Sequence, residues 1–153
     1  MPRIHENFAG QATAADQLWR VARLLRFRAA AFLRAAGLDV TPEQWGLLLR
    51  LAGQGGVPLG ELVDPVLADH PNVTRMVDGL VKRGLAERLP NPEDRRGVLV
   101  RLTGQGKDLL DATLPDLVEE KERYFHGLDR AEVTELQRML ALVEANLVHP
   151  PEE

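Results

Sequence analysis

The chain of 153 residues contains neither cysteine nor serine. Without cysteine it has no disulfide bond, no thiolate metal ligand and no thiol chemistry, and without serine it has no serine nucleophile. It also lacks the run of about 18 apolar residues that a membrane span requires. The first residues have no apolar core typical of a signal peptide. We therefore expect a cytoplasmic protein.

Metal-binding and phosphate-binding patterns are also missing. The four histidines, at positions 5, 70, 126 and 149, do not share the spacing of metal ligands. The segment Thr103-Gly104-Gln105-Gly106-Lys107 is a weak match to a phosphate loop, because the first glycine is absent and Asp108 stands where Ser or Thr is needed. It is better interpreted as the capped start of a helix. We expect no catalytic residue, no metal and no cofactor.

Charge is distributed unevenly along the chain, whose net charge is −4. Residues 71–102 hold seven Arg and Lys against four Asp and Glu, and residues 1–40 hold six against three, so each segment carries +3. Residues 103–153 carry −7. An ordinary solvent-exposed surface of mixed charge could account for any one of these segments. It accounts less well for the separation of two basic segments from one acidic segment. Because the local field near a phosphate matters more than the total charge, the acidic total does not exclude DNA.

The most informative helix lies after residue 70. The apolar residues Val73, Val77 and Leu80 recur at helical spacing, while Pro71 fits the first turn, where its missing N–H costs nothing. Gly84 follows as a C-terminal stop. The pattern predicts a helix with one buried face and polar residues at its exposed start.

A hairpin follows this helix. Strands are expected at residues 85–89 and 98–102, joined by a turn that contains Asp94-Arg95-Arg96. Val57 and Pro58 can add a short strand to the same sheet. A helix followed by a hairpin with a basic tip is the order in which a winged helix-turn-helix presents itself to DNA.

This part of the chain resembles the MarR-type (multiple antibiotic resistance regulator) family of winged helix-turn-helix transcriptional regulators. The matching motifs are Glu61-Leu62, Thr74-Arg75-Met76-Val77-Asp78, Gly84-Leu85, Asp94-Arg95-Arg96 and Leu102-Thr103. The resemblance extends over roughly residues 16–148. It implies a mainly α fold with a small β wing, and terminal helices that build a homodimer.

Two features depart from the family pattern. Pro65 stands inside the expected first helix of the motif, residues 59–68, and would kink or break it. His70-Pro71-Asn72 replaces the small Ser/Thr-rich start that is usual in the family, which suggests a base preference of its own.

The remaining sequence predicts helices around this module. We expect an N-terminal dimerisation helix within residues 1–36, a DNA-binding lobe at 41–102 and C-terminal dimerisation helices at 103–148, together forming one compact domain. The first helix is expected from Ala14 to Ala36, with Gly37 as its stop.

Two capping boxes mark where helices begin. Thr41 with Gln44 is expected to cap one helix, and Asp129 with Glu132 the last one. In the last helix the apolar residues alternate in steps of four and three: Val133, Leu136, Leu140, Val143 and Leu147. This spacing is typical of helices that pack on helices. Intramolecular packing could explain the stripe, but the family resemblance favours a twofold dimer.

The helix after residue 70 is the expected recognition helix, and four residues at its start are expected to contact DNA. Asn72, Thr74 and Arg75, placed by Pro71, are expected to enter the major groove of double-stranded DNA. The alternative for Arg75 is a contact with phosphate only, or with an acid such as Asp94.

The wing supplies the other expected DNA contacts. Arg96 is expected in the minor groove and Arg95 on phosphates, with Asp94 orienting one of these guanidinium groups or that of Arg75. The operator is expected to be pseudo-palindromic, with half-sites about one DNA turn apart.

A small effector is expected where the dimer helices meet the DNA-binding lobe. Trp19, Arg20, Arg23 and Trp45 would offer aromatic walls and a cation to an aromatic acid or phenol. The alternative is that both tryptophans are ordinary core residues.

We therefore interpret the chain as a ligand-released transcriptional regulator, and specifically a repressor. The main alternative is a winged-helix protein-interaction module without DNA binding, which would not need Arg95, Arg96 and Arg101 together. An enzyme is a distant third.

Overall fold

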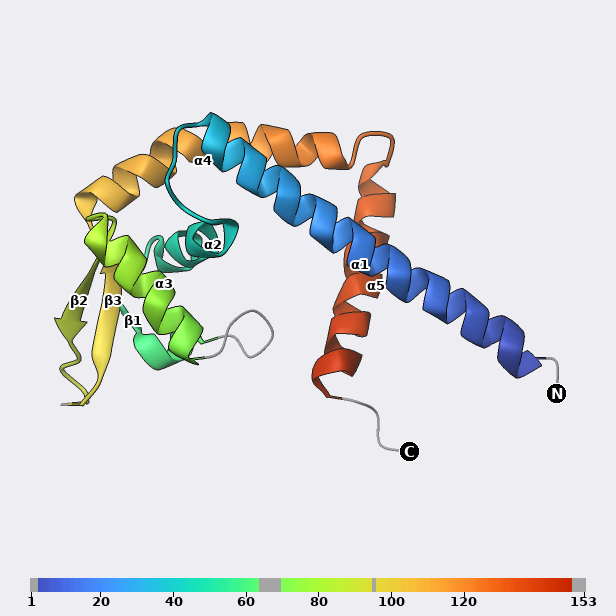
Figure 1. Cartoon of the computed structure of the whole chain (residues 1–153), viewed down its shortest axis with the longest axis horizontal. Helices are drawn as coiled ribbons and strands as arrows, with labels where there is room; N and C mark the ends of the chain where they lie inside the picture. The colour runs from blue at the N-terminus through green and yellow to red at the C-terminus, as the bar shows by residue number, and fades with distance from the viewer. Residues whose placement is uncertain (1–2, 64–69, 95, 150–153) are drawn as a thin grey trace. The chain divides into compact units, whose positions relative to one another are not determined.

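The computed structural model describes residues 3–63, 70–94 and 96–149, and over residues 3–12 and at His70 it describes the backbone alone. The described part is mainly helical with one small antiparallel sheet, as predicted (Figure 1). The chain divides into two compact units, Met1–Arg50 and Leu51–Glu153. In the described part no helix is both long and apolar enough to cross a membrane.

The first unit contains a long helix, α1 (Arg3–Ala35). This helix begins well before Ala14, so the predicted start was wrong. Between the two positions only Gly10 is unfavourable in a helix, and it costs about 1 kcal/mol relative to alanine. The predicted stop at Gly37 is confirmed, because this residue has a φ of 74° and its N–H donates to the carbonyl of Arg34 at 3.0 Å.

A second helix of this unit, α2 (Pro42–Leu51), begins with the predicted capping box. The N–H of Thr41 donates to Oε1 of Gln44 at 3.1 Å, and the N–H of Gln44 donates to Oγ1 of Thr41 at 3.2 Å. Trp45 and Leu48 on this helix are buried. The capping box therefore fixes where α2 begins.

The second unit is a short sheet with helices. Its elements are β1 (Val57–Pro58), the 3-10 helix η1 (Leu59–Leu62), α3 (His70–Lys82), β2 (Ala86–Pro90), β3 (Val98–Leu102), α4 (Gly104–Tyr124) and α5 (Arg130–Val148). All strand pairs are antiparallel, in the order β1-β3-β2. The predicted extra strand at Val57 is confirmed, because this residue pairs with Val100.

Helix α3 packs its apolar face inward. Val73, Val77 and Leu80 are fully buried, and the helix contacts β2 and η1. The predicted stop at Gly84 is confirmed: the N–H of Gly84 donates to the carbonyl of Val81 at 2.9 Å, and its φ is 71°. The N–H of the next residue donates back to Leu80 at 3.0 Å, so the end of α3 leads directly into β2.

The predicted helix at residues 59–68 was wrong in its extent. Among the described residues of this segment, the helical part is the single turn of η1, because Val63 already has an extended backbone, with φ −70° and ψ 120°. Pro65, which was expected to kink or break this helix, lies outside the described residues. A helix usually ends at or before the residue preceding a proline, which agrees with the early end at Val63.

Helices α4 and α5 both begin at side-chain caps. Thr103 Oγ1 accepts from the N–H of Gly106 at 3.0 Å, so the glycine-rich segment is a helix start, as interpreted. Asp129 and Glu132 form the predicted capping box. Helix α5 contains no buried residue; within its apolar stripe Leu140, Val143 and Leu147 are exposed, while Val133 and Leu136 are half-buried.

Candidate nucleic-acid interface

The start of α3 presents polar side chains to solvent. Pro71, Asn72 and Arg75 are exposed, whereas Thr74 is half-buried. Nη2 of Arg75 donates to Oδ1 of Asn72 at 2.5 Å, so these two predicted DNA contacts share one hydrogen bond. The positive end of the helix dipole lies at the same place and favours a negatively charged group such as phosphate.

An ion pair links α3 to the neighbouring strand. Arg88 Nη2 of β2 lies 2.8 Å from Asp78 Oδ1 of α3. A second pair lies across the sheet, where Arg101 Nε is 2.8 Å from Glu87 Oε1. Both arginines therefore have a carboxylate partner within the protein, and a phosphate contact would have to compete with that partner.

The predicted wing is the turn between β2 and β3. Its ends are joined by a hydrogen bond from the N–H of Asn91 to the carbonyl of Gly97 at 3.1 Å. Within it, Asp94 Oδ1 accepts from the backbone N–H of Arg96 at 2.9 Å, and Asn91 Oδ1 accepts from that of Glu93 at 3.0 Å. Arg96 is exposed at this tip, and Arg95 lies outside the described residues.

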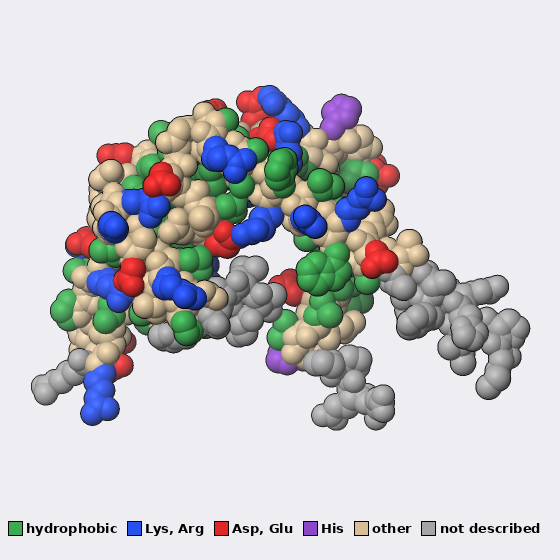
Figure 2. Space-filling model, viewed as in Figure 1, with side chains coloured by type: hydrophobic (Ala, Val, Ile, Leu, Met, Phe, Trp, Pro, Cys, Tyr) green, Lys and Arg blue, Asp and Glu red, His purple; other side chains and the backbone are tan. Residues whose placement is uncertain are grey.

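Two acceptor side chains thus brace the wing, and its glycine fits closely between them. A Cβ atom on Gly97 would lie 3.0 Å from Asp94 Oδ2 and 3.1 Å from Asn91 Nδ2. The tip is consequently too tight for any other residue unless these side chains move. Figure 2 shows Lys and Arg side chains among Asp and Glu over α3 and the strands, so this face is mixed rather than uniformly basic.

Three arginines were expected to distinguish a DNA-binding wing from a protein-interaction module: Arg95, Arg96 and Arg101. Their environments differ. Arg101 is paired with Glu87, and Arg95 is not described. Of the three, only Arg96 is placed by the structure as an exposed cation at the tip.

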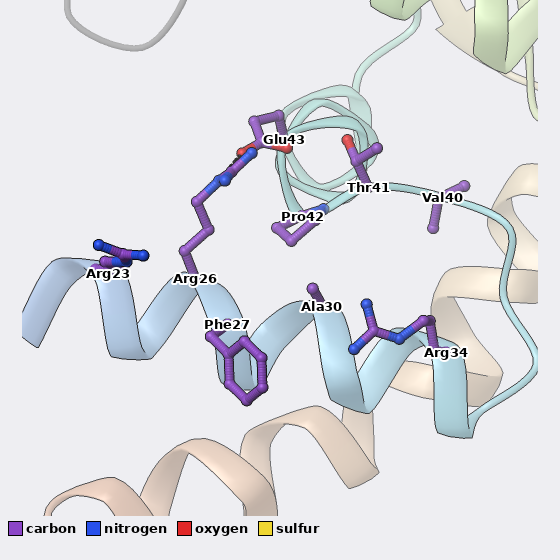
Figure 3. A pocket seen from close by; sticks show the side chains of 9 residues that line it. All are labelled: Arg23, Arg26, Phe27, Ala30, Arg34, Val40, Thr41, Pro42 and Glu43. Atoms are coloured by element: carbon purple, nitrogen blue, oxygen red, sulfur yellow. Dashed lines mark hydrogen bonds and ion pairs between the residues drawn. The ribbon is translucent and has the colours of Figure 1, made fainter.

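A cavity of about 400 Å³ lies within the first unit, between α1 and the start of α2. Nine residues line it: Arg23, Arg26, Phe27, Ala30, Arg34, Val40, Thr41, Pro42 and Glu43 (Figure 3). The cavity has three guanidinium groups against one carboxylate, with an apolar lining between them. Its volume lies within the range of about 300–1,000 Å³ that is usual for small-molecule sites.

The four residues predicted to bind an effector are not gathered around this cavity. Arg23 lines it, but Trp19 is 79% exposed, Arg20 is also exposed, and Trp45 is 4% exposed with its Nε1 lacking a hydrogen-bond partner. Trp19 and Trp45 therefore have opposite environments. The two-tryptophan arrangement stays a prediction that the cavity does not support.

Sequence reasoning missed the other cationic residues of the cavity. Arg23, Arg26, Ala30 and Arg34 are separated by three and four residues, so they follow one face of α1. This spacing was visible in the sequence. Nothing in the local pattern, however, predicted that Glu43 would face these arginines.

Arg26 and Glu43 form an ion pair across this cavity. Nε of Arg26 lies 2.5 Å from Oε1 of Glu43. Burial alone would raise the pKa of Glu43, but hydrogen bonds from Arg26, from the backbone N–H of Glu43 and from Thr41, together with the charge of Arg26, outweigh burial and lower this pKa. The hydrogen bond and charge of Glu43 raise the pKa of Arg26.

Comparison with known proteins gives consistent matches. The MarR family model matches residues 40–98. The chain is 30% identical over 107 residues to the transcriptional regulator MhqR of Bacillus subtilis, covering 70% of this chain and 74% of MhqR. It is 44% identical over 69 residues to the multiple antibiotic resistance protein MarR of Salmonella typhimurium, covering 45% of this chain. That match spans only 48% of the Salmonella protein, about half its length.

Solved structures agree with these sequence matches. A mutant of Escherichia coli MarR complexed with operator DNA has a TM-score of 0.70 and 31% identity, covering 83% of this chain and 93% of that one. Bordetella bronchiseptica BpsR, whose DNA binding is regulated by 6-hydroxynicotinic acid, has a TM-score of 0.67 and 28% identity, covering 84% and 98%. The proteins named here are regulators of transcription or of drug resistance, and none is named as an enzyme.

Proposed function

Because the chain belongs to the MarR family of winged helix-turn-helix regulators, we propose that it is a sequence-specific DNA-binding transcriptional repressor. The observation that carries this proposal is the pairing of two exposed elements in one unit: the start of α3, with Asn72 and Arg75, and the braced wing tip with Arg96. The operator complex of a similar MarR supports it. The recognition helix would read base edges in the major groove, and the wing would reach the minor groove.

We further propose that the active form is a homodimer. Helix α5 exposes an apolar stripe that includes Leu140 at 41%, Val143 at 39% and Leu147 at 78%. Helix α1 also exposes large apolar side chains, with Leu24 at 55% and Phe27 at 65%. Contiguous exposed apolar surface is costly in water and marks an interface. A twofold axis would present two copies of α3 to the two halves of a pseudo-palindrome.

The same proposal includes release by a small aromatic acid or phenol. The cavity between α1 and the start of α2 offers guanidinium groups beside apolar side chains, and this combination suits an aromatic anion. The regulation of BpsR by 6-hydroxynicotinic acid supports this class of effector. Such a ligand can act only if it binds the DNA-competent and DNA-incompetent states with different affinity. A tenfold release corresponds to about 1.4 kcal/mol of coupling.

The test is binding of the purified protein to the DNA upstream of its own gene. A scrambled duplex of equal length and composition is the control, and both are titrated between about 50 and 200 mM salt. We expect tighter binding to the upstream DNA, and weaker binding when an effective aromatic acid is added. Equal affinity for both duplexes at every salt concentration would refute a sequence-specific regulator and favour the protein-interaction module.

A further inference from the structure

The cavity of the first unit contains its own carboxylate. Arg23, Arg26 and Arg34 approach it from one helix, and Glu43 approaches from the start of α2. Figure 3 shows the Arg26 side chain extending from α1 to Glu43, with Ala30 and Pro42 beside this bridge. The guanidinium of Arg34 lies near Ala30, and Phe27 projects on the side of α1 away from Glu43.

The Arg26–Glu43 contact has the geometry that a bound carboxylate would adopt. A carboxylate oxygen lies 2.5 Å from Nε of Arg26, and a guanidinium group binds a free carboxylate through the same donors. The side chains are 71% and 34% exposed, so water and solutes reach the pair. An ion pair this exposed is weak, so a competing anion can displace Glu43.

We propose that Glu43 is a built-in competitor that occupies Arg26 and thereby sets which small molecules enter this cavity. A ligand carboxylate would displace Glu43 from Arg26 and gain the charges of Arg23 and Arg34 as well. The displaced carboxylate remains near the N-terminus of α2, where a negative charge is favourable. This inference rests on the proposed ligand response and adds the residue that controls it.

The lining defines the class of ligand. Ala30, Val40 and Pro42 provide apolar surface between the arginines, which suits a planar ring, while Arg26 selects a carboxylate. A neutral amide of the same shape cannot replace Glu43, because it carries no charge to satisfy the guanidinium group. The cavity should therefore distinguish an aromatic monocarboxylate from its amide.

The experiment titrates benzoate and benzamide into the full-length protein and measures each affinity by calorimetry. In Glu43→Gln, which keeps the size of the side chain, benzoate binding should become about fivefold tighter, as expected from loss of an exposed pair. Benzamide binding should stay unchanged. If Glu43 had only a structural role, Glu43→Gln would change the affinities for benzoate and benzamide by the same factor. The ratio of the benzoate affinity to the benzamide affinity therefore distinguishes the two explanations.

Two further variants make the result decisive. Asp16→Asn removes one exposed negative charge of α1 that does not line the cavity, and it should leave the benzoate-to-benzamide ratio at its wild-type value. The double variant Arg26→Gln with Glu43→Gln should lose the tighter benzoate binding that Glu43→Gln alone is expected to show. Circular dichroism checks that each variant is folded.

The outcomes separate this inference from the proposed function. If Glu43→Gln binds benzoate no more tightly than the wild type, the competitor role is refuted even where benzoate binds. If it also fails to bind benzoate at millimolar concentration, the cavity is not a carboxylate site. Binding of the wild type to the upstream DNA is measured separately. Absence of sequence-specific binding there would refute the proposed function as a DNA-binding regulator.

Discussion

Asp94 supports the backbone of Arg96 at the tip of the wing, with 2.9 Å between Oδ1 of Asp94 and the amide nitrogen of Arg96. This hydrogen bond closes a turn of the main chain, a local bond that Asp and Asn commonly form. The predicted role of Asp94 in orienting a guanidinium group stays a prediction, because Arg95 lies outside the described residues. This bond restrains the backbone at Arg96, whose side chain is exposed.

This arrangement predicts a large effect of Arg96→Ala. We expect a marked loss of affinity for operator DNA and a shallower salt dependence, because one cation fewer reaches the DNA. Lys121→Ala, which removes an exposed cation from α4, is the matched control and should have little effect. The measurement is fluorescence anisotropy of a labelled duplex over a range of salt. Undiminished operator affinity in Arg96→Ala would refute its role.

Arg75 is expected to read a base edge. Arg75→Ala should lose about 1–3 kcal/mol of binding to the operator and much less to random DNA. Asn72→Ala should lose part of the same discrimination, because Asn72 Oδ1 accepts a hydrogen bond from Arg75. Lys82→Ala, at the other end of α3, is the control. An equal loss on both DNAs would show that Arg75 contacts phosphate only.

The exposed stripe of α5 predicts how the dimer can be broken. Leu140→Glu places a charge in the stripe, so the protein should sediment as a monomer at micromolar concentration and bind the operator weakly. Ala145→Glu introduces the same charge on a different face of α5 and should remain dimeric. A monomeric wild type would remove the basis of the two-half-site mechanism.

The Arg26–Glu43 pair predicts a dependence of stability on pH. The folded pKa of Glu43 lies below its ordinary value of 4.5, so the unfolded chain takes up the proton first as the pH falls. The stabilising effect of the pair is therefore complete above the ordinary pKa and disappears as the pH falls through the lowered folded pKa.

Thermal unfolding of the wild type and of Glu43→Gln tests this dependence. The wild type should be more stable at pH 7, and the difference should become smaller as the pH is lowered from 7 to 3. Asp16→Asn corrects for the general loss of one negative charge. A stability difference that is the same at both pH values would show that the pair does not contribute through the charge of Glu43.

Local structure was largely predictable from the sequence, because its causes lie within a few residues. The Thr41–Gln44 and Asp129–Glu132 capping boxes each join residues three apart, and both are present. Gly84 ends α3 because a residue with positive φ is needed there, and glycine adopts it without strain. The short strand at Val57 and Pro58 was also predicted, whereas its register, with Val57 opposite Val100, comes from the structure.

Contacts between distant residues were decided only by the tertiary structure. Arg26 and Glu43 lie 17 positions apart, and no periodic pattern relates them. The pairs Arg88–Asp78 and Arg101–Glu87 show the same limit: the sequence gives the number of charges in this segment, but only the fold shows which arginine pairs with which carboxylate. Burial also escapes local patterns, since Trp19 and Trp45 have the same chemistry and opposite exposure. Propensity and capping act along the chain, whereas charge pairing and burial depend on which segments folding brings together.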